Sequence, residues 1–158
     1  MQRIPVNEPR LDGNEKKYLM ECIDTGWISF EGPFVKRFEA GIAEVSGRKY
    51  GISVSNGSVA LDTAMLALQL QAGDEVIMPT FTIMSCAAAV VRVGAIPVLV
   101  DADPVTWNMK IADSTSKITA RTKAIMVVHT YGLPVDMDPV IEIANEYNLY
   151  IIEDAAEM

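Results

Sequence analysis

Residues 51–70 read GISVSNGSVALDTAMLALQL, and this stretch combines a short apolar segment, a polar turn and a helical pattern. The apolar segment Gly51–Val54 is typical of a buried strand. The turn Ser55–Ser58 follows it, and apolar positions at helical spacing then predict a helix from about residue 58 to residue 70. Repeated units of this kind are typical of an α/β fold with a parallel sheet.

The turn at residues 55–58 is suited to an anion. The first N–H groups of a helix have no partner within the helix, and the helix dipole adds about half a positive charge there. Gly57 lets a ligand approach the backbone closely, and the hydroxyls of Ser55 and Ser58 are further donors. A phosphate fits such a place. The alternative is that Asn56 or Ser58 only caps the helix, and the turn taken alone favours this alternative.

The remainder of the chain repeats the strand–turn–helix unit. Short apolar runs rich in Val and Ile predict further strands, and helical patterns fall between them: strands at 75–78, 96–100, 124–128 and 149–152, and helices near 82–93, 110–118 and 137–147. Continuously apolar runs are typical of strands that are buried on both faces. We therefore predict an α/β fold with a mostly parallel sheet over residues 49–158 and helices on both of its faces. Residues 1–48 are predicted to be an N-terminal helical segment, with a first helix from about Asn14 to Thr25 and a second helix that has Pro33 in its first turn.

Composition narrows the possible classes of protein. Half of the 158 residues are hydrophobic, yet no apolar run approaches the length of a membrane span, and the polar N-terminus lacks the apolar core of a signal peptide. A net charge of −8 without a basic cluster argues against nucleic acid as a partner. Cys22 and Cys86 match no metal or disulfide spacing, so we expect reduced, packed thiols in a reducing compartment.

Asp154 is the strongest single candidate for chemistry. It follows the apolar run Leu149–Ile152 directly, and ligands bind beyond the carboxyl ends of the strands in sheets of this kind. A carboxylate there is costly to desolvate unless a cation faces it. A protonated pyridine nitrogen is such a cation, and holding that proton makes a bound pyridoxal ring an electron sink. The alternative is that Glu153 or Asp154 only caps the next helix.

Three other polar residues also follow predicted strands. His129 is the only histidine in the chain, and at such a position we favour a hydrogen-bonded structural role over a catalytic base. Asp101 and Asp103 end another strand, but Pro104 indicates that they shape a turn. We therefore expect no metal site.

Several different short motifs follow one another along the chain. They are Gly26–Ser29 with Gly32–Pro33, Ser55–Ser58 with Val59–Leu61, Gly73–Val76, Pro79–Thr82, Gly94–Val98 with Asp101, Val128–Gly132 and Glu153–Ala156. Together these motifs resemble those of the DegT/DnrJ/EryC1/StrS family of sugar aminotransferases that depend on pyridoxal phosphate. The resemblance covers the whole chain and is greatest for the perosamine-synthase-like members.

The resemblance implies a fold and an activity. The fold would be the three-layer large domain of a type I aminotransferase, of which residues 1–158 form an incomplete N-terminal portion. The activity would be transfer of an amino group, usually from glutamate, to a nucleotide-linked 4-keto-6-deoxy sugar, with pyridoxal 5′-phosphate as cofactor. Family members are cytoplasmic homodimers, and the perosamine-type sugars enter cell-surface polysaccharides such as the O antigen of lipopolysaccharide.

The resemblance also implies roles for five residues. Gly57 and Ser58 match the positions that hold the cofactor phosphate, and Asp154 matches the acid that faces the pyridine nitrogen. Ile83 lies where the family often has an aromatic ring stacked on the cofactor. Glu157 lies where the family has a polar residue near the phenolic oxygen of the ring, and a glutamate there would have to be protonated or paired.

The Schiff-base lysine of the family has no counterpart here. In family members it follows the motif that contains Asp154, whereas all seven lysines of this chain precede Asp154. We therefore expect that lysine after Met158, no catalytic residue within residues 1–158, and no turnover by these residues alone.

Two alternatives stay open on the sequence alone. Some relatives with the same fold are sugar dehydratases in which histidine replaces the lysine, and only sequence beyond Met158 would separate them. A non-catalytic truncated product is the other alternative. A Rossmann-type dehydrogenase is disfavoured, because no Gly-x-Gly-x-x-Gly motif follows any predicted strand.

Overall fold

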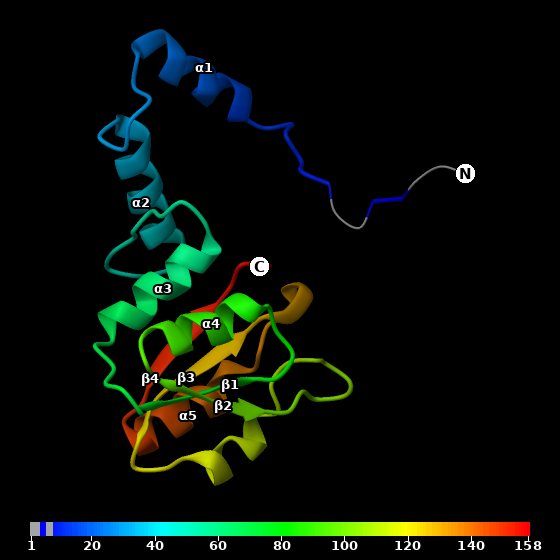
Figure 1. Cartoon of the computed structure of the whole chain (residues 1–158). Coiled ribbons are helices and arrows are strands. Elements are labelled where there is room, and N and C mark those ends of the chain that lie inside the picture. Colours follow the sequence, from blue (N-terminus) through cyan, green and yellow to red (C-terminus); the bar gives the residue numbers. More distant parts are fainter. Residues whose placement is uncertain (1–3, 6–7) are drawn as a thin grey trace. The chain divides into compact units, whose positions relative to one another are not determined.

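The computed structural model describes residues 4, 5 and 8–158. These residues divide into two compact units, of which the first ends at Ser53 and the second runs from Val54 to Met158 (Figure 1). The division lies close to the predicted change from the helical segment to the βα repeats at residue 49. Each unit is described by itself below.

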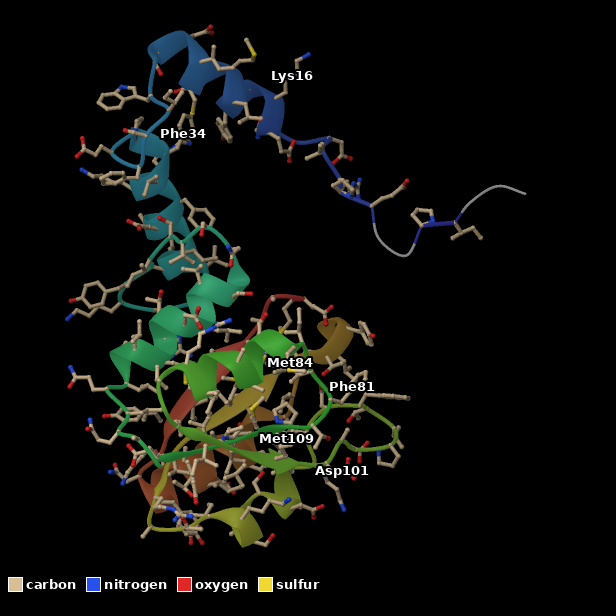
Figure 2. The ribbon with its side chains drawn as sticks, in the orientation of Figure 1. Lys16, Phe34, Phe81, Met84, Asp101 and Met109 are labelled. Atoms are coloured by element: carbon tan, nitrogen blue, oxygen red, sulfur yellow. The ribbon has the colours of Figure 1, made fainter. Side chains whose placement is uncertain are left out.

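The first unit contains two helices, α1 (Glu15–Thr25) and α2 (Pro33–Val45). Helix α1 ends at Gly26, whose φ of 72° is a left-handed conformation that glycine adopts without a steric cost. Pro33 is the first residue of α2, where its missing N–H is not needed. Phe34, labelled in Figure 2, packs on Tyr18 with 5.3 Å between the ring centroids. The helices expected near 14–25 and from Pro33 are thereby confirmed.

The strand predicted at Gly51–Val54 is wrong. This segment pairs with no strand among the described residues. Instead, the backbone N–H and the hydroxyl of Ser53 both donate to Oε1 of Glu39, each at 2.9 Å. A Cβ atom at Gly51 would clash with the backbone carbonyl of Glu39. A short apolar run reads as a strand in the sequence, but it becomes one only where a neighbouring strand supplies hydrogen-bond partners.

The second unit is built on a four-stranded parallel sheet (Figure 1). Its strands are β1 (Glu75–Pro79), β2 (Ile96–Val100), β3 (Thr122–Val128) and β4 (Tyr150–Asp154), and their order is β2-β1-β3-β4. All three neighbouring pairs are parallel. The inner strands β1 and β3 are buried almost throughout, whereas the outer strands β2 and β4 are partly exposed, so burial on both faces is confirmed only for the inner pair.

Helices cover both faces of the sheet, as predicted. Helices α3 (Gly57–Ala67) and α4 (Met84–Arg92) pack over one face, and α5 (Met137–Tyr147) packs against β3 and β4 on the other (Figure 1). Alternate residues of a strand point to opposite faces, so each strand contributes to two cores. One core contains Met65, Val76, Met78, Cys86, Val90, Ala124 and Met126, and the other contains Ile77, Val100, Met109, Ile125, Val127, Val140 and Ala144.

The helix predicted near 110–118 is wrong in type. The segment forms two short 3₁₀ turns, Ile111–Asp113 and Thr115–Lys117. Its Asp, Ser and Thr side chains compete for backbone hydrogen bonds, which disfavours a continuous α-helix. The Oγ of Ser116, for example, donates to the backbone carbonyl of Asp113 at 2.9 Å.

Candidate functional site

A cavity of about 350 Å³ lies at the carboxyl edge of the sheet. Its lining comes from the segments that follow β1, β3 and β4: Phe81, Thr82, Ile83, Val128, His129, Thr130, Tyr131, Asp154, Ala156 and Glu157. Figure 2 shows Phe81 after β1, Asp101 after β2 and Met84 at the start of α4, all at this edge. The volume is within the usual range for small-molecule sites, and the position is the one predicted for a parallel sheet.

The lining includes three of the five residues singled out in the sequence. Ile83, Asp154 and Glu157 all border the cavity. Gly57 and Ser58 do not border it and lie instead at the start of α3. The structure therefore gathers the ring-side candidates in one cavity and keeps the phosphate-side candidates on a neighbouring element of the same unit.

The first turn of α4 connects the two groups of candidates. The hydroxyl of Ser58 is 2.9 Å from the hydroxyl of Ser85, and the thiol of Cys86 donates to Oδ2 of Asp154 at 3.3 Å. Ser85 and Cys86 are neighbours in the chain, and adjacent Cα atoms are about 3.8 Å apart. The start of α3 and the end of β4 thus lie at the same edge of the sheet, as one small ligand in contact with both would require.

The start of α3 has a capping side chain and, beside Gly57, free space for a ligand. Oδ1 of Asn56 accepts from the backbone N–H of Val59 at 3.0 Å, which confirms that Asn56 caps the helix. A Cβ atom built on Gly57 would meet no atom within 4 Å. The cap leaves the first N–H groups of α3 without carbonyl partners within the helix, and the space beside Gly57 is open to a ligand.

The carboxylate of Asp154 is partly buried and held at both oxygens. Oδ2 accepts from Cys86, and Oδ1 accepts from the backbone N–H of Ala156 at 3.1 Å. The second bond spans two residues and is typical of an Asx turn, so Asp154 shapes the local turn and does not cap a helix within the described residues. Each carboxylate oxygen has about two acceptor sites, and the side chain therefore retains capacity toward the cavity.

Cys86 is fully buried, and sequence reasoning treated it only as a packed thiol. Burial raises its pKa to about 11, and the neighbouring carboxylate of Asp154 acts in the same direction. The side chain is therefore a neutral thiol at physiological pH, a weak nucleophile and a hydrogen-bond donor. In the sequence, the one feature that distinguishes Cys86 is its position in the first turn of the helix that follows the Pro79–Thr82 motif.

Glu157 is hydrogen-bonded to the loop after β3. Its Oε2 accepts from the backbone N–H of Tyr131 at 2.7 Å. The next residue, Gly132, has a φ of 79°, and a Cβ atom there would come within 2.9 Å of the backbone oxygen of Glu157. Only glycine suits both constraints, so the loops after β3 and β4 approach each other closely beside the cavity.

His129 has the structural role that the sequence favoured. Its Nδ1 accepts from the backbone N–H of Val135 at 3.0 Å, and its Nε2 lies 3.1 Å from Oε1 of Glu153. Because Nδ1 acts as an acceptor, the ring proton is on Nε2, which donates to the carboxylate. Both ring nitrogens are engaged, and the side chain is almost completely buried.

An aromatic group beside the cavity was missed in the sequence. The rings of Trp107 and Tyr131 lie 5.1 Å and 6.3 Å from the ring of Phe81, measured between centroids. Trp107 and Tyr131 have left-handed φ values of 64° and 52°, which bulky residues rarely adopt. No sequence pattern reports that three loops bring their rings together.

The aspartates after β2 shape a turn, as predicted. Oδ1 of Asp103 accepts from the N–H groups of Val105 and Thr106, each at 2.9 Å, and these bonds lower the pKa of Asp103. Among residues 4, 5 and 8–158, no cluster of three His, Cys, Asp or Glu side chains has a geometry suited to a metal ion. The helices in this same part of the chain are all too short or too polar to cross a bilayer.

A second cavity, of about 610 Å³, opens at the amino ends of β3 and β4. Its lining contains no carboxylate: Ile118, Thr119, Ala120, Thr122, Lys123, Tyr147, Asn148, Leu149 and Tyr150. It lacks the combination of an apolar wall and an acid that distinguishes the cavity at the carboxyl edge.

Comparison with known proteins identifies the family. Residues 9–158 match the model of the DegT/DnrJ/EryC1/StrS aminotransferase family. The chain belongs to this family. It is 48% identical over 157 residues to the GDP-perosamine synthase of Escherichia coli O157:H7 and 50% identical over 157 residues to that of Caulobacter vibrioides. Each alignment covers 99% of this chain but only 43% and 42% of the relative, so the chain spans less than half the length of these enzymes.

Solved structures confirm the fold. The GDP-4-keto-6-deoxy-D-mannose-3-dehydratase of E. coli, solved with bound hydrated pyridoxal phosphate, superposes with a TM-score of 0.89 at 29% identity. The match covers 98% of this chain and 41% of that protein. The predicted fold class, an incomplete type I aminotransferase-like α/β domain, is therefore confirmed, and the expected cofactor is the one bound to this relative.

Proposed function

We propose that the chain belongs to an enzyme that transfers an amino group to a nucleotide-linked 4-keto-6-deoxy sugar, with pyridoxal phosphate as cofactor. The observation that carries the proposal is identity of 48% and 50% with two GDP-perosamine synthases across almost the whole chain. Those names favour a GDP-linked sugar and a perosamine-type product. Glutamate as amino donor, a homodimeric assembly in the cytoplasm and a role in lipopolysaccharide synthesis are parts of the same proposal.

The cavity fits the cofactor. The carboxylate of Asp154 gives it an acid suited to a protonated pyridine nitrogen, and the side chains of Phe81 and Ile83 give it apolar walls for a planar ring. The open space beside Gly57, at the start of α3, suits a phosphate. We therefore assign Asp154 to the ring nitrogen, Gly57 and Ser58 to the phosphate, and Ile83 to the ring face.

The chain's own residues then bind and orient the cofactor. When bound, pyridoxal phosphate supplies the electron sink that amino transfer requires. Asp154 would keep the ring nitrogen protonated, and Ile83 would shield one face of the ring from water. Glu157, paired with the N–H of Tyr131, would border the ring near its phenolic oxygen. The lysine that binds the cofactor in this family is proposed to lie outside residues 1–158.

The dehydratase is the second candidate function. The chain superposes on the dehydratase with a TM-score of 0.89, so the backbone does not exclude this activity. Sequence identity favours the aminotransferase, because the dehydratase is 29% identical whereas the two GDP-perosamine synthases are 48% and 50% identical.

The activity is tested on the whole protein that contains this chain. We expect that, with pyridoxal phosphate, glutamate and GDP-4-keto-6-deoxymannose, it forms a sugar that carries a new amine and keeps its 3-hydroxyl, as read by mass spectrometry. Loss of the 3-hydroxyl would show a dehydratase instead. A matched protein with Asp154→Asn serves as the control for amine formation.

Residues 1–158 alone give a second test. We expect this chain to bind pyridoxal phosphate without a covalent bond, because none of its lysines matches the family position. The chain is mixed with cofactor, reduced with borohydride and weighed by mass spectrometry. A stoichiometric adduct at a single lysine would contradict the assignment.

A further inference from the structure

The thiol of Cys86 lies between two polar side chains inside the core on the α3 and α4 face of the sheet. Its Sγ is 3.3 Å from Oγ1 of Thr82 and 3.3 Å from Oδ2 of Asp154, and no part of the residue is exposed. A buried cysteine usually packs as a small hydrophobe. Here the same side chain instead joins the turn after β1 to the acid at the end of β4.

The directions of the two hydrogen bonds follow from the available protons. An ionised carboxylate only accepts, so the single S–H proton of Cys86 points to Asp154. The hydroxyl of Thr82 is then the donor to Sγ. The pKa of Cys86, raised to about 11 by burial and by Asp154, keeps this proton in place at physiological pH. The result is a one-directional chain from Thr82 through Cys86 to Asp154.

We propose that Cys86 is a positioning residue: its thiol, supported by Thr82, fixes the Asp154 carboxylate in the orientation that meets the ring nitrogen of pyridoxal phosphate. The inference rests on the proposed function. Asp154 is the last residue of an outer strand and is only partly buried, so the strand itself does not fix its side chain. The N–H of Ala156 holds one carboxylate oxygen and Cys86 holds the other.

The competing explanation is that Cys86 only fills space in the core. Packing depends on the volume of the side chain, whereas positioning depends on its donor. Serine keeps a donor in a smaller side chain, and alanine removes the donor. Thr82→Val keeps the shape of residue 82 and removes only the hydroxyl that supports the thiol. These variants separate the two explanations.

The test compares two ligands on the whole protein that contains this chain. One ligand is pyridoxal phosphate, and the other is its analogue in which a carbon replaces the ring nitrogen. Both have the same aldehyde and phosphate, so a lysine outside these residues affects both alike. Dissociation constants are measured by equilibrium dialysis for wild type, Cys86→Ala, Cys86→Ser, Thr82→Val and Asp154→Asn, with circular dichroism and thermal unfolding as checks of folding.

Cys86→Ala should weaken the binding of pyridoxal phosphate about five- to tenfold, in line with the loss of one hydrogen bond from a weak donor. Its affinity for the carbon analogue should stay within about twofold, because that ligand has no ring nitrogen to meet the acid. Cys86→Ser should restore most of the affinity for pyridoxal phosphate, and Thr82→Val should give a smaller loss than Cys86→Ala.

Three outcomes would overturn the inference. Equal losses for both ligands in Cys86→Ala, or no rescue by serine, would show a packing role. Unchanged affinity for pyridoxal phosphate in folded Cys86→Ala would show no role. If wild type and Asp154→Asn do not distinguish the two ligands, the assignment of Asp154 itself fails, and that result is separate from any result at residue 86.

Discussion

The two ends of the sheet each contain a carboxylate at a strand terminus, and the two are used differently. Glu75 is the first residue of β1 at the amino edge, and Asp154 is the last residue of β4 at the carboxyl edge. Glu75 is 4% exposed, whereas Asp154 is partly buried and borders a cavity. One acid therefore has its partners within the fold, and the other has a side chain that faces a cavity.

Glu75 is surrounded by strong donors. The hydroxyls of Thr119 and Thr122 donate to Oε2 at 2.5 Å and 3.3 Å, and the guanidinium of Arg121 donates twice to Oε1. The hydrogen bonds from Thr119 and Arg121 lower the pKa of Glu75. These four bonds join β1 to the start of β3 and to the segment before it, so the acid is used to hold neighbouring strands in register.

Asp154 is surrounded by fewer and weaker donors. One thiol and one backbone N–H reach it within the described residues, and no cationic side chain lies within ion-pair distance. A thiol is a weak donor compared with a guanidinium. An acid with this environment gains more from a cationic ligand than Glu75 would, which is why the carboxyl edge and not the amino edge is the candidate site.

The largest expected effect comes from Asp154→Asn. We expect pyridoxal phosphate to bind about a hundredfold more weakly, since the ring nitrogen would lose its ionic partner, a loss of about 3 kcal/mol. The free energy of unfolding without cofactor should change by less than about 1 kcal/mol, because no internal ion pair is broken. Equilibrium dialysis and urea unfolding measure the two quantities, and a large loss of stability with normal binding would reverse the comparison.

Glu75→Ala should have the opposite profile. Removal of the carboxylate leaves Thr119, Thr122 and Arg121 without their shared acceptor, so we expect a loss of about 2 kcal/mol in the free energy of unfolding. Urea unfolding measures it. Asp113→Asn removes the exposed ion pair with Lys110 and is the control, with an expected change below about 0.5 kcal/mol. Equal effects of the two substitutions would show that the hydrogen bonds of Glu75 contribute no more to stability than an exposed ion pair does.

The acid dependence of stability gives a third contrast. The pKa of Glu75 is lower in the folded protein than its ordinary value of 4.5. Its contribution is therefore fully present above that value and is lost as the pH falls through the folded pKa. We expect Glu75→Gln to lose less stability than wild type between pH 5 and the acid limit of folding, by an amount that urea titrations at each pH resolve. Parallel curves for the two proteins would show that Glu75 does not contribute to the loss of stability at low pH.

The smallest expected effect concerns the phosphate side of the site. Ser58→Ala should weaken the binding of pyridoxal phosphate about fivefold, because one hydroxyl donor worth about 1 kcal/mol is lost. Pyridoxal, which lacks the phosphate, should bind Ser58→Ala and wild type alike. Fluorescence titration with both ligands measures the ratio. A similar loss for pyridoxal would point to the hydrogen bond between Ser58 and Ser85 and not to the phosphate.

Elements of the structure were predicted correctly where they depend on local sequence patterns. The four strands of the sheet and helices α1 to α5 follow from apolar periodicity, and Asn56 and Pro33 act as the local rules for helix starts require. The predictions at Gly51–Val54 and 110–118 were wrong, because one segment lacks a partner strand and the other has side chains that compete with the helix. Of the site, Asp154, Ile83 and Glu157 could be placed at the carboxyl edge, because each follows the end of a predicted parallel strand.

The sequence by itself determined the family, the βα order and the edge at which a ligand would bind, because these depend on motifs and on the direction of parallel strands. Only the tertiary structure decided which side chains meet there. Cys86 and Asp154 are 68 residues apart, and Ser58 and Ser85 are 27 apart. Contacts across such separations depend on how helix α4 packs over the sheet, and packing is a property of the whole assembly of elements that no local pattern encodes.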